Sequence, residues 1–369
     1  MSAFCLAVHA GYRCQHAGAC CQNWAVPAEA DVVEVVTRMG LRRRGTSGTL
    51  FLAAVSSDPQ VPDAWTVARD ERGDCVFFDR DAGRSCVIHR EAGIAALPAA
   101  CRHFPRKVRI DARDTRISLS HYCPTAAGLL LTGGGLEIVE AAAPLLLPVP
   151  MEGLDATAAL PPLVRPGLLS DLEGYHAWER AALSIFSRPG LTHEECLDLI
   201  SAATERLRTW RPQTEPLSTC VRREFEITDA GQSRDRTWCA RAIQVMNNLS
   251  CDKASPLDSA DQLDDEWTRH VGDQHEWLEG PTKNYLAARL FGNWVAYQGR
   301  GLRTVLEWLR ACAAVVRSEL LARVARSGAP PTAADFIEAV RAADLRLLHV
   351  VDSAMFAQHV AAIEGPDPR

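Results

Sequence analysis

The sequence lacks the features that mark several classes of protein. With 40 Lys and Arg against 46 Asp and Glu, the net charge is −6, so no basic excess favours nucleic acid as a partner. The longest apolar stretches, 126–131 and 141–150, are far shorter than the ~20 residues of a membrane span, and prolines interrupt the second. No basic leader followed by an apolar run opens the chain, as a secretory signal would. We therefore expect a cytoplasmic protein with no nucleic-acid or membrane partner.

Cysteine, in contrast, is plentiful. In a reducing compartment, thirteen cysteines favour metal binding or catalysis over disulfide bonds. Eight of them precede residue 124, whereas the other five are scattered without the spacing of metal ligands. Thiolates are preferred ligands of zinc and of iron–sulfur clusters. We predict a metal centre held by seven of these residues: Cys14, Cys20, Cys21, Cys75, Cys86, Cys101 and Cys123.

The uneven spread of cysteine also suggests how the chain is divided. A length of 369 residues is typical of about two domains. We predict a cysteine-rich region that binds an iron–sulfur cluster or zinc over residues 1–140, a Pro-rich connector over 141–167 and a helical domain over 168–369. The predicted fold class is mainly α. Its N-terminal region is stapled by the metal or cluster and holds short β-hairpins, and an all-helical region follows.

The cysteine-rich region contains three local signals. Residues 27–40 have Pro in the first turn, early acids and a closing Gly, which predicts a short helix. The β-rich runs 75–79 and 85–89 flank Asp-Ala-Gly, which predicts a hairpin. A second hairpin is predicted to pair 107–111 with 116–120.

The region after the connector shows helical signals. Thr192 and Glu195 form a capping-box pattern at the start of a helix with apolar residues at helical spacing. The stretch 302–326 predicts an amphipathic helix that ends at Gly328. Thr332 is predicted to cap another helix, which runs towards Ile363.

The adjacent pair Cys20 and Cys21 bears on the kind of centre. Neighbouring side chains in an extended segment point to opposite sides, so both sulfurs rarely reach one tetrahedral ion. The pair therefore suits a polynuclear cluster, two separate sites, or one ligand beside a reserve thiol. If Asp79 pairs with Arg84 in the first hairpin, Cys75 and Cys86 share a face about 7–8 Å apart, and a slip of one residue would separate them.

The ordered motifs resemble a known family. The chain carries YRCQHAGACCQNW from residue 12, CVFFDRDAGRSCVIHREAG from 75, CRHFPR from 101 and LSHYCPTAAGLLL from 119. This series resembles the flagellin lysine N-methylases and the wider set of CxxCxxCC proteins that chelate zinc or iron. Later, Asn284-Tyr285-Leu286 resembles the Asn-Tyr-Leu segment of that family.

The resemblance implies an enzyme with two cofactors. It implies an iron–sulfur protein, with a 4Fe–4S cluster or, alternatively, zinc, that transfers methyl from S-adenosylmethionine to lysines of a protein substrate, flagellin or another. The seven cysteines match the motif cysteines of the family. Where the family has one more cysteine, this chain reads Gln15-His16-Ala17-Gly18-Ala19. Either His16 is a nitrogen ligand or the centre has one ligand fewer.

The matching segments also supply candidates for the chemistry. A lysine amine, with an unperturbed pKa of about 10.4, must lose its proton before it attacks the methyl carbon. Tyr122 and Tyr285 are the candidate catalytic residues. Arg102 and Arg106, beside Cys101, and Asn284 are the candidate cofactor-binding residues, although the arginines could equally belong to an exposed strand face. The alternatives are a non-catalytic zinc- or iron-binding module with a helical partner-binding domain, and a metal-transfer protein that uses Cys20-Cys21.

Overall fold

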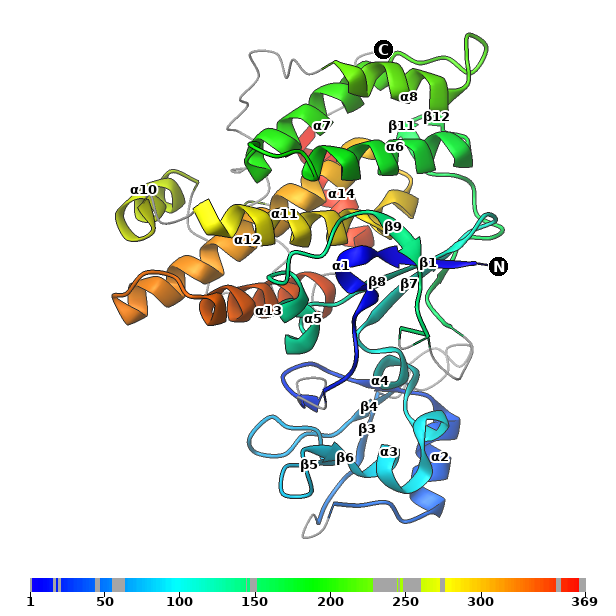
Figure 1. The fold of residues 1–369 in the computed structure, drawn as a ribbon. Coiled ribbons are helices and arrows are strands. Elements are labelled where there is room, and N and C mark those ends of the chain that lie inside the picture. Colours follow the sequence, from blue (N-terminus) through cyan, green and yellow to red (C-terminus); the bar gives the residue numbers. More distant parts are fainter. Residues whose placement is uncertain are drawn as a thin grey trace.

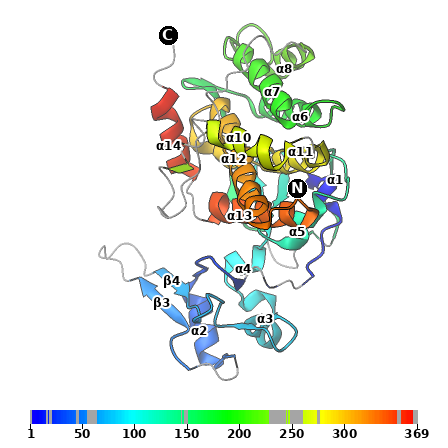
Figure 2. The ribbon, with the colours of Figure 1, turned by 90° about the vertical axis from the view of Figure 1, so that its left-hand side faces the viewer.

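The computed structural model describes most of the chain: residues 2–15, 18, 21–43, 47–54, 64–143, 145–146, 151–227, 244, 246–247, 260–272, 276–349 and 353–364. Helices predominate over strands, as the predicted mainly α class requires. Figure 1 and the turned view in Figure 2 show a larger body of helices around a sheet, with a smaller lobe below it. We call these parts the helical body and the small lobe, the latter being the described residues between 21 and 104. Among the described helices, none combines the length and the apolarity that a membrane crossing requires.

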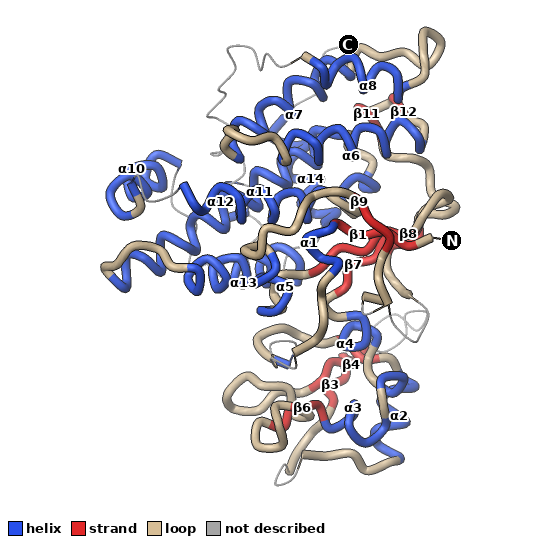
Figure 3. The backbone as a smooth tube through the Cα atoms, in the orientation of Figure 1, coloured by secondary structure: helices blue, strands red, loops and turns tan. Residues whose placement is uncertain are grey.

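A mixed five-stranded sheet lies in the helical body, next to the small lobe (Figure 3). Its order is β10-β7-β8-β1-β9. The strands are β1 (Ala3–Leu6), β7 (Arg106–Ile110), β8 (Thr115–Leu119), β9 (Ile138–Glu140) and β10 (Leu154–Asp155). The second predicted hairpin, at residues 107–120, is confirmed. β7 and β8 pair antiparallel, from Arg106 with Leu119 to Ile110 with Thr115. β1 runs parallel to β8, and β10 runs parallel to β7.

The helices pack around this sheet and around one another. They are α1 (Ala7–Ala10), α5 (Pro124–Leu129), α6 (Leu172–Phe186), α7 (His193–Leu207), α8 (Leu217–Glu226), α10 (Ala260–His270), α11 (Glu276–Leu290), α12 (Leu302–Ser327), α13 (Ala333–His349), α14 (Ser353–Glu364) and the 3-10 turn η4 (Val295–Gln298). The capping box of Thr192 and Glu195 forms as predicted. A short hairpin of β11 (Leu163–Arg165) and β12 (Leu168–Leu169) precedes α6.

Helix α12 is buried along most of its length at the centre of the helical body. The helix ends where predicted, since Gly328 adopts a left-handed φ of 63° and its N–H bonds to the carbonyl of Val324. The helix predicted to run from Thr332 towards Ile363 is two helices, α13 and α14. The residues between them lie outside the described part of the chain.

The small lobe has its own apolar core. It contains β2 (Pro27–Ala28), α2 (Ala30–Arg38), β3 (Phe51–Ala54), β4 (Ala64–Val67), β5 (Phe78–Asp79), β6 (Ser85–Cys86), α3 (Val87–Ala92), the 3-10 turn η2 (Ile94–Ala96) and α4 (Ala99–His103). Val36 and Phe77 are almost fully buried in its core. The helix predicted for 27–40 begins later, because Pro27 and Ala28 pair with β4 instead.

The first predicted hairpin forms with a different register. Asp79 pairs with Ser85 and Phe78 with Cys86, one residue away from the predicted alignment. The strands are short, because residues 75–78 make a turn, closed by the bond from Phe78 N to Cys75 O, and α3 begins at Val87. Cys75 therefore lies in a turn and not in a paired strand, so the alternation of side chains along a hairpin does not apply to it. The prediction that Cys75 and Cys86 share a face because of the strand register is wrong.

The apolar clusters of the structure do not follow the predicted domain boundaries at residues 140 and 167. The largest apolar cluster joins Leu6 and Val8 of the N-terminal region with Leu136 and with α6, α7, α11 and α12. A second cluster, with Ile117 and Leu119, links the sheet to Cys123. The small lobe alone contributes the third. Whether 1–140 and 168–369 fold independently stays a prediction.

Candidate functional site

Three of the predicted metal ligands meet through backbone contacts in the small lobe. The N–H of Cys75 donates to the carbonyl of Cys21 at 2.7 Å. The N–H of Phe78 donates to Cys75 O at 2.9 Å, and Phe78 pairs with Cys86 across the β5–β6 hairpin. Segments more than fifty residues apart in sequence thus bring these cysteines to one place.

Cys101, in α4, packs against the apolar core of the same lobe. Cys75, Cys86 and Cys101 all pack against the apolar core of the lobe, and each is partly exposed. Helix α4 is held there because the carboxylate of Glu29 accepts bonds from the N–H of Ala99. These thiols therefore lie at the boundary between core and solvent. The predicted ligands Cys20 and His16 lie outside the described residues.

The other two described ligands, Cys14 and Cys123, lie at a second position beside Tyr12. The Tyr12 hydroxyl is 3.8 Å from Cys123 Sγ. Burial raises the pKa of the Cys123 thiol, and a charge on nearby Cys14 raises it further. Cys123 is buried, whereas Cys14 is exposed. The two groups of cysteines are bridged where the Tyr122 hydroxyl donates to the carbonyl of Gln22, next to Cys21, at 2.8 Å.

Both candidate catalytic tyrosines are buried and have bonded hydroxyls. Tyr122 is bonded to Gln22 O, and the guanidinium of Arg341 lies 5.5 Å from its ring. The Tyr285 hydroxyl donates to Asp344 at 2.8 Å, and burial raises its pKa well above the ordinary value. A phenol so placed does not lose its proton readily, so the local contacts of Tyr285 favour a packing role.

The candidate cofactor-binding residues do not converge. Arg102 donates to the carbonyl of Ala95 and reaches Glu152 at 3.3 Å. Arg106 donates to Leu145 O at 2.5 Å and lies over the Tyr12 ring. Asn284 donates to Leu130 O at 2.9 Å, in the helical body. Each side chain bonds to a different segment.

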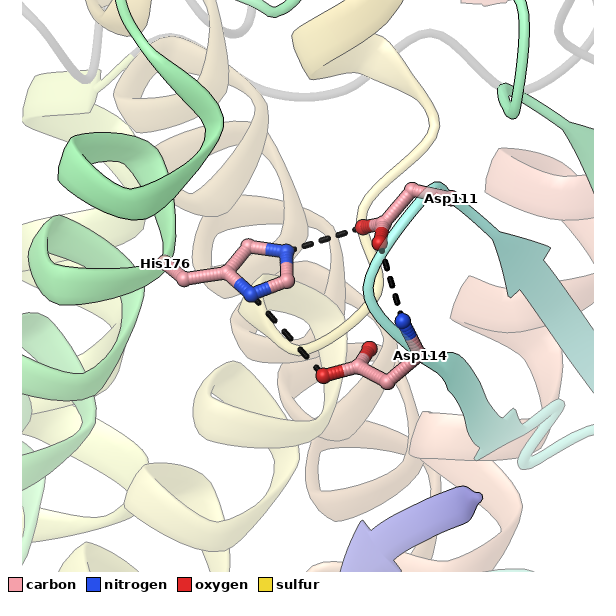
Figure 4. A group of neighbouring side chains, drawn as sticks. All are labelled: Asp111, Asp114 and His176. Carbon is pink, nitrogen blue, oxygen red and sulfur yellow. Dashed lines mark hydrogen bonds and ion pairs between the residues drawn. The ribbon is translucent and has the colours of Figure 1, made fainter. Parts of the chain in front are cut away.

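Among the described residues, a single group of side chains has donors close enough for one metal ion, namely Asp111, Asp114 and His176. Figure 4 shows His176 between the two carboxylates, with Nε2 2.8 Å from Asp111 and Nδ1 3.8 Å from Asp114. Burial acts against the charge of Asp111, but hydrogen bonds from His176 and the backbone of Arg113 hold its pKa below the usual range.

Two arginines already supply positive charge to this group. Arg116 Nη2 lies 3.1 Å from His176 Nδ1, and Arg109 Nη2 lies 3.4 Å from Nε2. Both arginines also pair with Glu179 of α6, which is fully buried. A metal cation would have to compete with both guanidinium groups for the same ring. We therefore interpret this group as an ion-pair network that fastens the β7–β8 hairpin to α6.

Sequence reasoning missed this network, although a signal existed. His176 and Glu179 lie on the same stripe of α6 as the buried Tyr175, Trp178 and Ala182. Ionisable residues on an apolar stripe indicate a buried partner of opposite charge.

A second buried network contains two histidines in contact. Nε2 of His9 lies 3.0 Å from Nε2 of His121, and Asp344 accepts the backbone N–H of His121 at 2.5 Å. Arg289 lies 3.4 Å from Asp344 and 3.3 Å from His121 Nδ1. Burial lowers the pKa of both histidines, and Arg289 lowers them further. Both rings are therefore neutral in the folded protein.

We expect the free energy of unfolding to fall as the pH drops below 6.5, the ordinary histidine value. The unfolded chain then binds protons that buried His9 and His121 refuse, so stability is full above 6.5 and is lost below it. Each such histidine contributes up to about 1.4 kcal/mol per pH unit. The pKa values of Asp111 and Asp344 are lowered, so these carboxyl groups reduce the free energy of unfolding only when the pH falls below their ordinary pKa of 3.8.

Urea unfolding at pH 7, 6 and 5 tests this expectation. A His9→Gln variant removes one of the titrating rings, so its stability should depend less steeply on pH. His359→Gln, in a partly exposed position on α14, is the control and should keep the wild-type slope. Equal slopes for wild type and His9→Gln would contradict the prediction.

Comparisons with protein-family models, with curated proteins and with solved structures found no match to this chain.

Proposed function

We propose that the protein is an iron–sulfur-dependent methyltransferase that transfers methyl from S-adenosylmethionine to lysine side chains of another protein, flagellin or a different one. The observation that carries the proposal is the meeting of cysteines from distant segments at the edge of one apolar core. Cys21, Cys75 and Cys86 are joined by backbone contacts, and Cys101 packs on the same core.

The donor set of the small lobe fits a cluster. Four described thiols would hold it, which is the number that a 4Fe–4S cluster takes. Sulfurs around one zinc ion lie about 3.8 Å apart, given the tetrahedral Zn–S length. No three described cysteines approach one another within 4.8 Å, and a polynuclear core separates its thiolates more widely. The described cysteines alone therefore do not form a three-thiolate zinc site in this structure.

The remaining chemistry divides between the cluster and the chain. When bound, a cluster held by three of these four thiols would leave one iron position for a polar group of S-adenosylmethionine. The chain must supply an environment in which a lysine amine loses its proton. Within the chain, burial lowers the pKa of Lys107 to about 8, which illustrates how desolvation favours loss of a proton from an amine.

A non-catalytic metal-binding module is the second candidate function. The observation that favours it is the bonding of the candidate catalytic and cofactor residues to other parts of the chain. The hydroxyls of Tyr122 and Tyr285 are both engaged, and Arg102 and Asn284 bond to separate backbone carbonyls. In this case the helical body would bind a partner protein.

Anaerobic purification followed by metal analysis and a methyl-transfer assay separates the two functions. The methyltransferase is expected to be brown, to contain iron and acid-labile sulfide, and to transfer radiolabelled methyl from S-adenosylmethionine to lysines of purified flagellin. Lysozyme serves as a second lysine-bearing acceptor, which tests specificity for flagellin. A colourless protein with stoichiometric zinc and no methyl transfer to either acceptor would contradict the methyltransferase and support the non-catalytic metal-binding module.

A further inference from the structure

A cavity of about 350 Å³ lies where the small lobe meets the helical body. Trp24 and Phe104 of the small lobe and Trp294 and Trp308 of the helical body form its aromatic walls. Lys107 of β7 also lines it. The cavity therefore places an amine among flat apolar surfaces.

Lys107 contributes this amine. Its side chain is partly exposed, so a small molecule that enters the cavity can reach it. Nζ lies 4.8 Å from the centre of the Trp294 ring, and no described residue offers it a hydrogen bond or an ion pair. Lys283 is also partly exposed, but its Nζ donates to the carbonyls of Arg188 and Leu191 at 3.2 and 3.0 Å. The amine of Lys107 can thus form a bond to a ligand, whereas that of Lys283 is already engaged.

The surroundings of Lys107 favour its neutral form. Desolvation and, next, the charge of Arg289 on α11 lower its pKa to about 8, although Asp344 on α13 and Cys312 on α12 act in the opposite direction. Asp344 is fully buried and already pairs with Arg289 at 3.4 Å. A substantial fraction of Lys107 is therefore neutral near pH 8, and a neutral amine is a nucleophile.

The charged groups of the wall are positive. Arg106, Lys107 and Arg289 line the cavity, and none of the residues described in its wall is an Asp or Glu. Nε of Arg289, which is 5% exposed, has no hydrogen-bond acceptor among the described residues. A ligand with a carboxylate and without a positive group is complementary to this wall. The indole and phenyl faces favour a flat ring in the remaining space.

We propose that Lys107 is a nucleophilic residue that forms an imine with the carbonyl group of a small aromatic 2-oxo acid bound in this cavity. The carbonyl carbon meets Nζ, the carboxylate lies towards the arginines, and the ring packs among the tryptophans. This activity is separate from the proposed methyl transfer, because neither S-adenosylmethionine nor the cysteines take part in it.

Imine formation at Lys107 needs no oxidant or reductant. The lone pair of neutral Nζ forms a C–N bond with the carbonyl carbon, and the C–O bond then breaks. Both protons of the amine leave with the carbonyl oxygen as water, and water reverses the reaction. When protonated, the imine draws electrons from the neighbouring carbon atoms, which is how imine-forming lysines activate carbonyl substrates.

Reductive trapping of the anaerobically purified full chain with phenylpyruvate tests the site. Sodium cyanoborohydride transfers hydride to the imine carbon and fixes the adduct as a secondary amine, which peptide mass spectrometry locates. At pH 7.5 we expect the peptide with Lys107 to be modified at least about tenfold more than the peptide with Lys283. Similar modification of the two peptides would overturn the proposal, and this comparison within wild type does not depend on the folding of a variant.

Lys107→Arg and Lys283→Arg are matched variants, because each keeps the positive charge and removes one primary amine. Lys107→Arg, checked by circular dichroism, should lose most of the trapped adduct, whereas Lys283→Arg should trap as much as wild type. A folded Lys107→Arg protein that traps phenylpyruvate as wild type does would place the reactive amine elsewhere.

Two competitors that cannot form an imine test the recognition of the carboxylate. Phenylacetate carries the ring and the carboxylate, and phenylacetamide has the same shape without the charge. We expect phenylacetate to halve trapping at Lys107 at a roughly tenfold lower concentration than phenylacetamide does. Equal protection by both would refute the carboxylate contact, and no protection by either would refute binding in the cavity.

Discussion

We expect the Asp344→Ala variant to lose about 3–5 kcal/mol of its free energy of unfolding. Asp344 is fully buried and accepts hydrogen bonds from the Tyr285 hydroxyl and the His121 backbone. Its carboxylate also lies 3.4 Å from the guanidinium of Arg289. Removing it leaves Arg289, itself 5% exposed, as a buried cation without its carboxylate partner. The loss therefore exceeds the value of the hydrogen bonds alone.

Chemical denaturation measured at pH 7.5 provides the check, with Glu338→Ala as the matched control. Glu338 lies on the same helix and pairs with Arg341 at 2.6 Å, but its side chain is 42% exposed. An exposed ion pair of this kind contributes about 1 kcal/mol or less. A loss for Asp344→Ala no larger than that for Glu338→Ala would show that the buried network is dispensable.

Replacing Cys86 by alanine is expected to lower the iron content of anaerobically purified protein roughly tenfold or more. Loss of a residue that only hydrogen-bonds to a metal ligand already lowers metal affinity about 10- to 100-fold, and loss of a ligand itself should cost at least as much. Cys86 lies beside Phe78 in the hairpin, and the N–H of Phe78 bonds to Cys75. Its thiol is therefore held next to the segment of a second predicted ligand. Iron, acid-labile sulfide and visible absorption per chain are the quantities to measure.

Cys196→Ala is the control for the loss of a thiol as such. Cys196 is fully buried in α7, and its Sγ donates to Ile185 O at 3.4 Å, far from the small lobe in the fold. This variant should keep wild-type iron. A wild-type iron content in Cys86→Ala would show that Cys86 is not a ligand. Wild-type iron contents in Cys75→Ala and Cys101→Ala as well would show that the small lobe does not hold the cluster.

Local sequence signals predicted the elements that depend on neighbouring residues. The capping box at Thr192, the end of α12 at Gly328 and the β7–β8 hairpin are each determined by side chains or turn residues within a few positions. The same reasoning placed the β5–β6 turn but mistook its register. There the turn at Cys75 and the start of α3 at Val87 shorten both strands.

Local sequence signals could not predict how much of each strand is buried by helices from elsewhere in the chain. Along β7, Lys107 and Arg109 alternate with Val108, which is typical of a strand with one polar face in water. In the structure Arg109 of that face is fully buried against Glu179, and Lys107, which stays partly exposed, lies beside Trp294. The partners come from helices far along the chain. Tertiary packing, which periodicity does not report, therefore decides the environment of the candidate site.

The contact between Tyr12 and Arg106 brings together the two ends of the segment that contains the small lobe. The chain leaves the helical body after Tyr12 and returns at Arg106, whose guanidinium lies 5.6 Å from the Tyr12 ring. None of the strands of the small lobe joins the five-stranded sheet. A segment whose ends touch in this way can be gained, lost or exchanged with only a short bridge, because closing the gap orders few residues. The small lobe, with Cys21, Cys75, Cys86 and Cys101, is thus connected to the helical body in the way that an inserted segment would be.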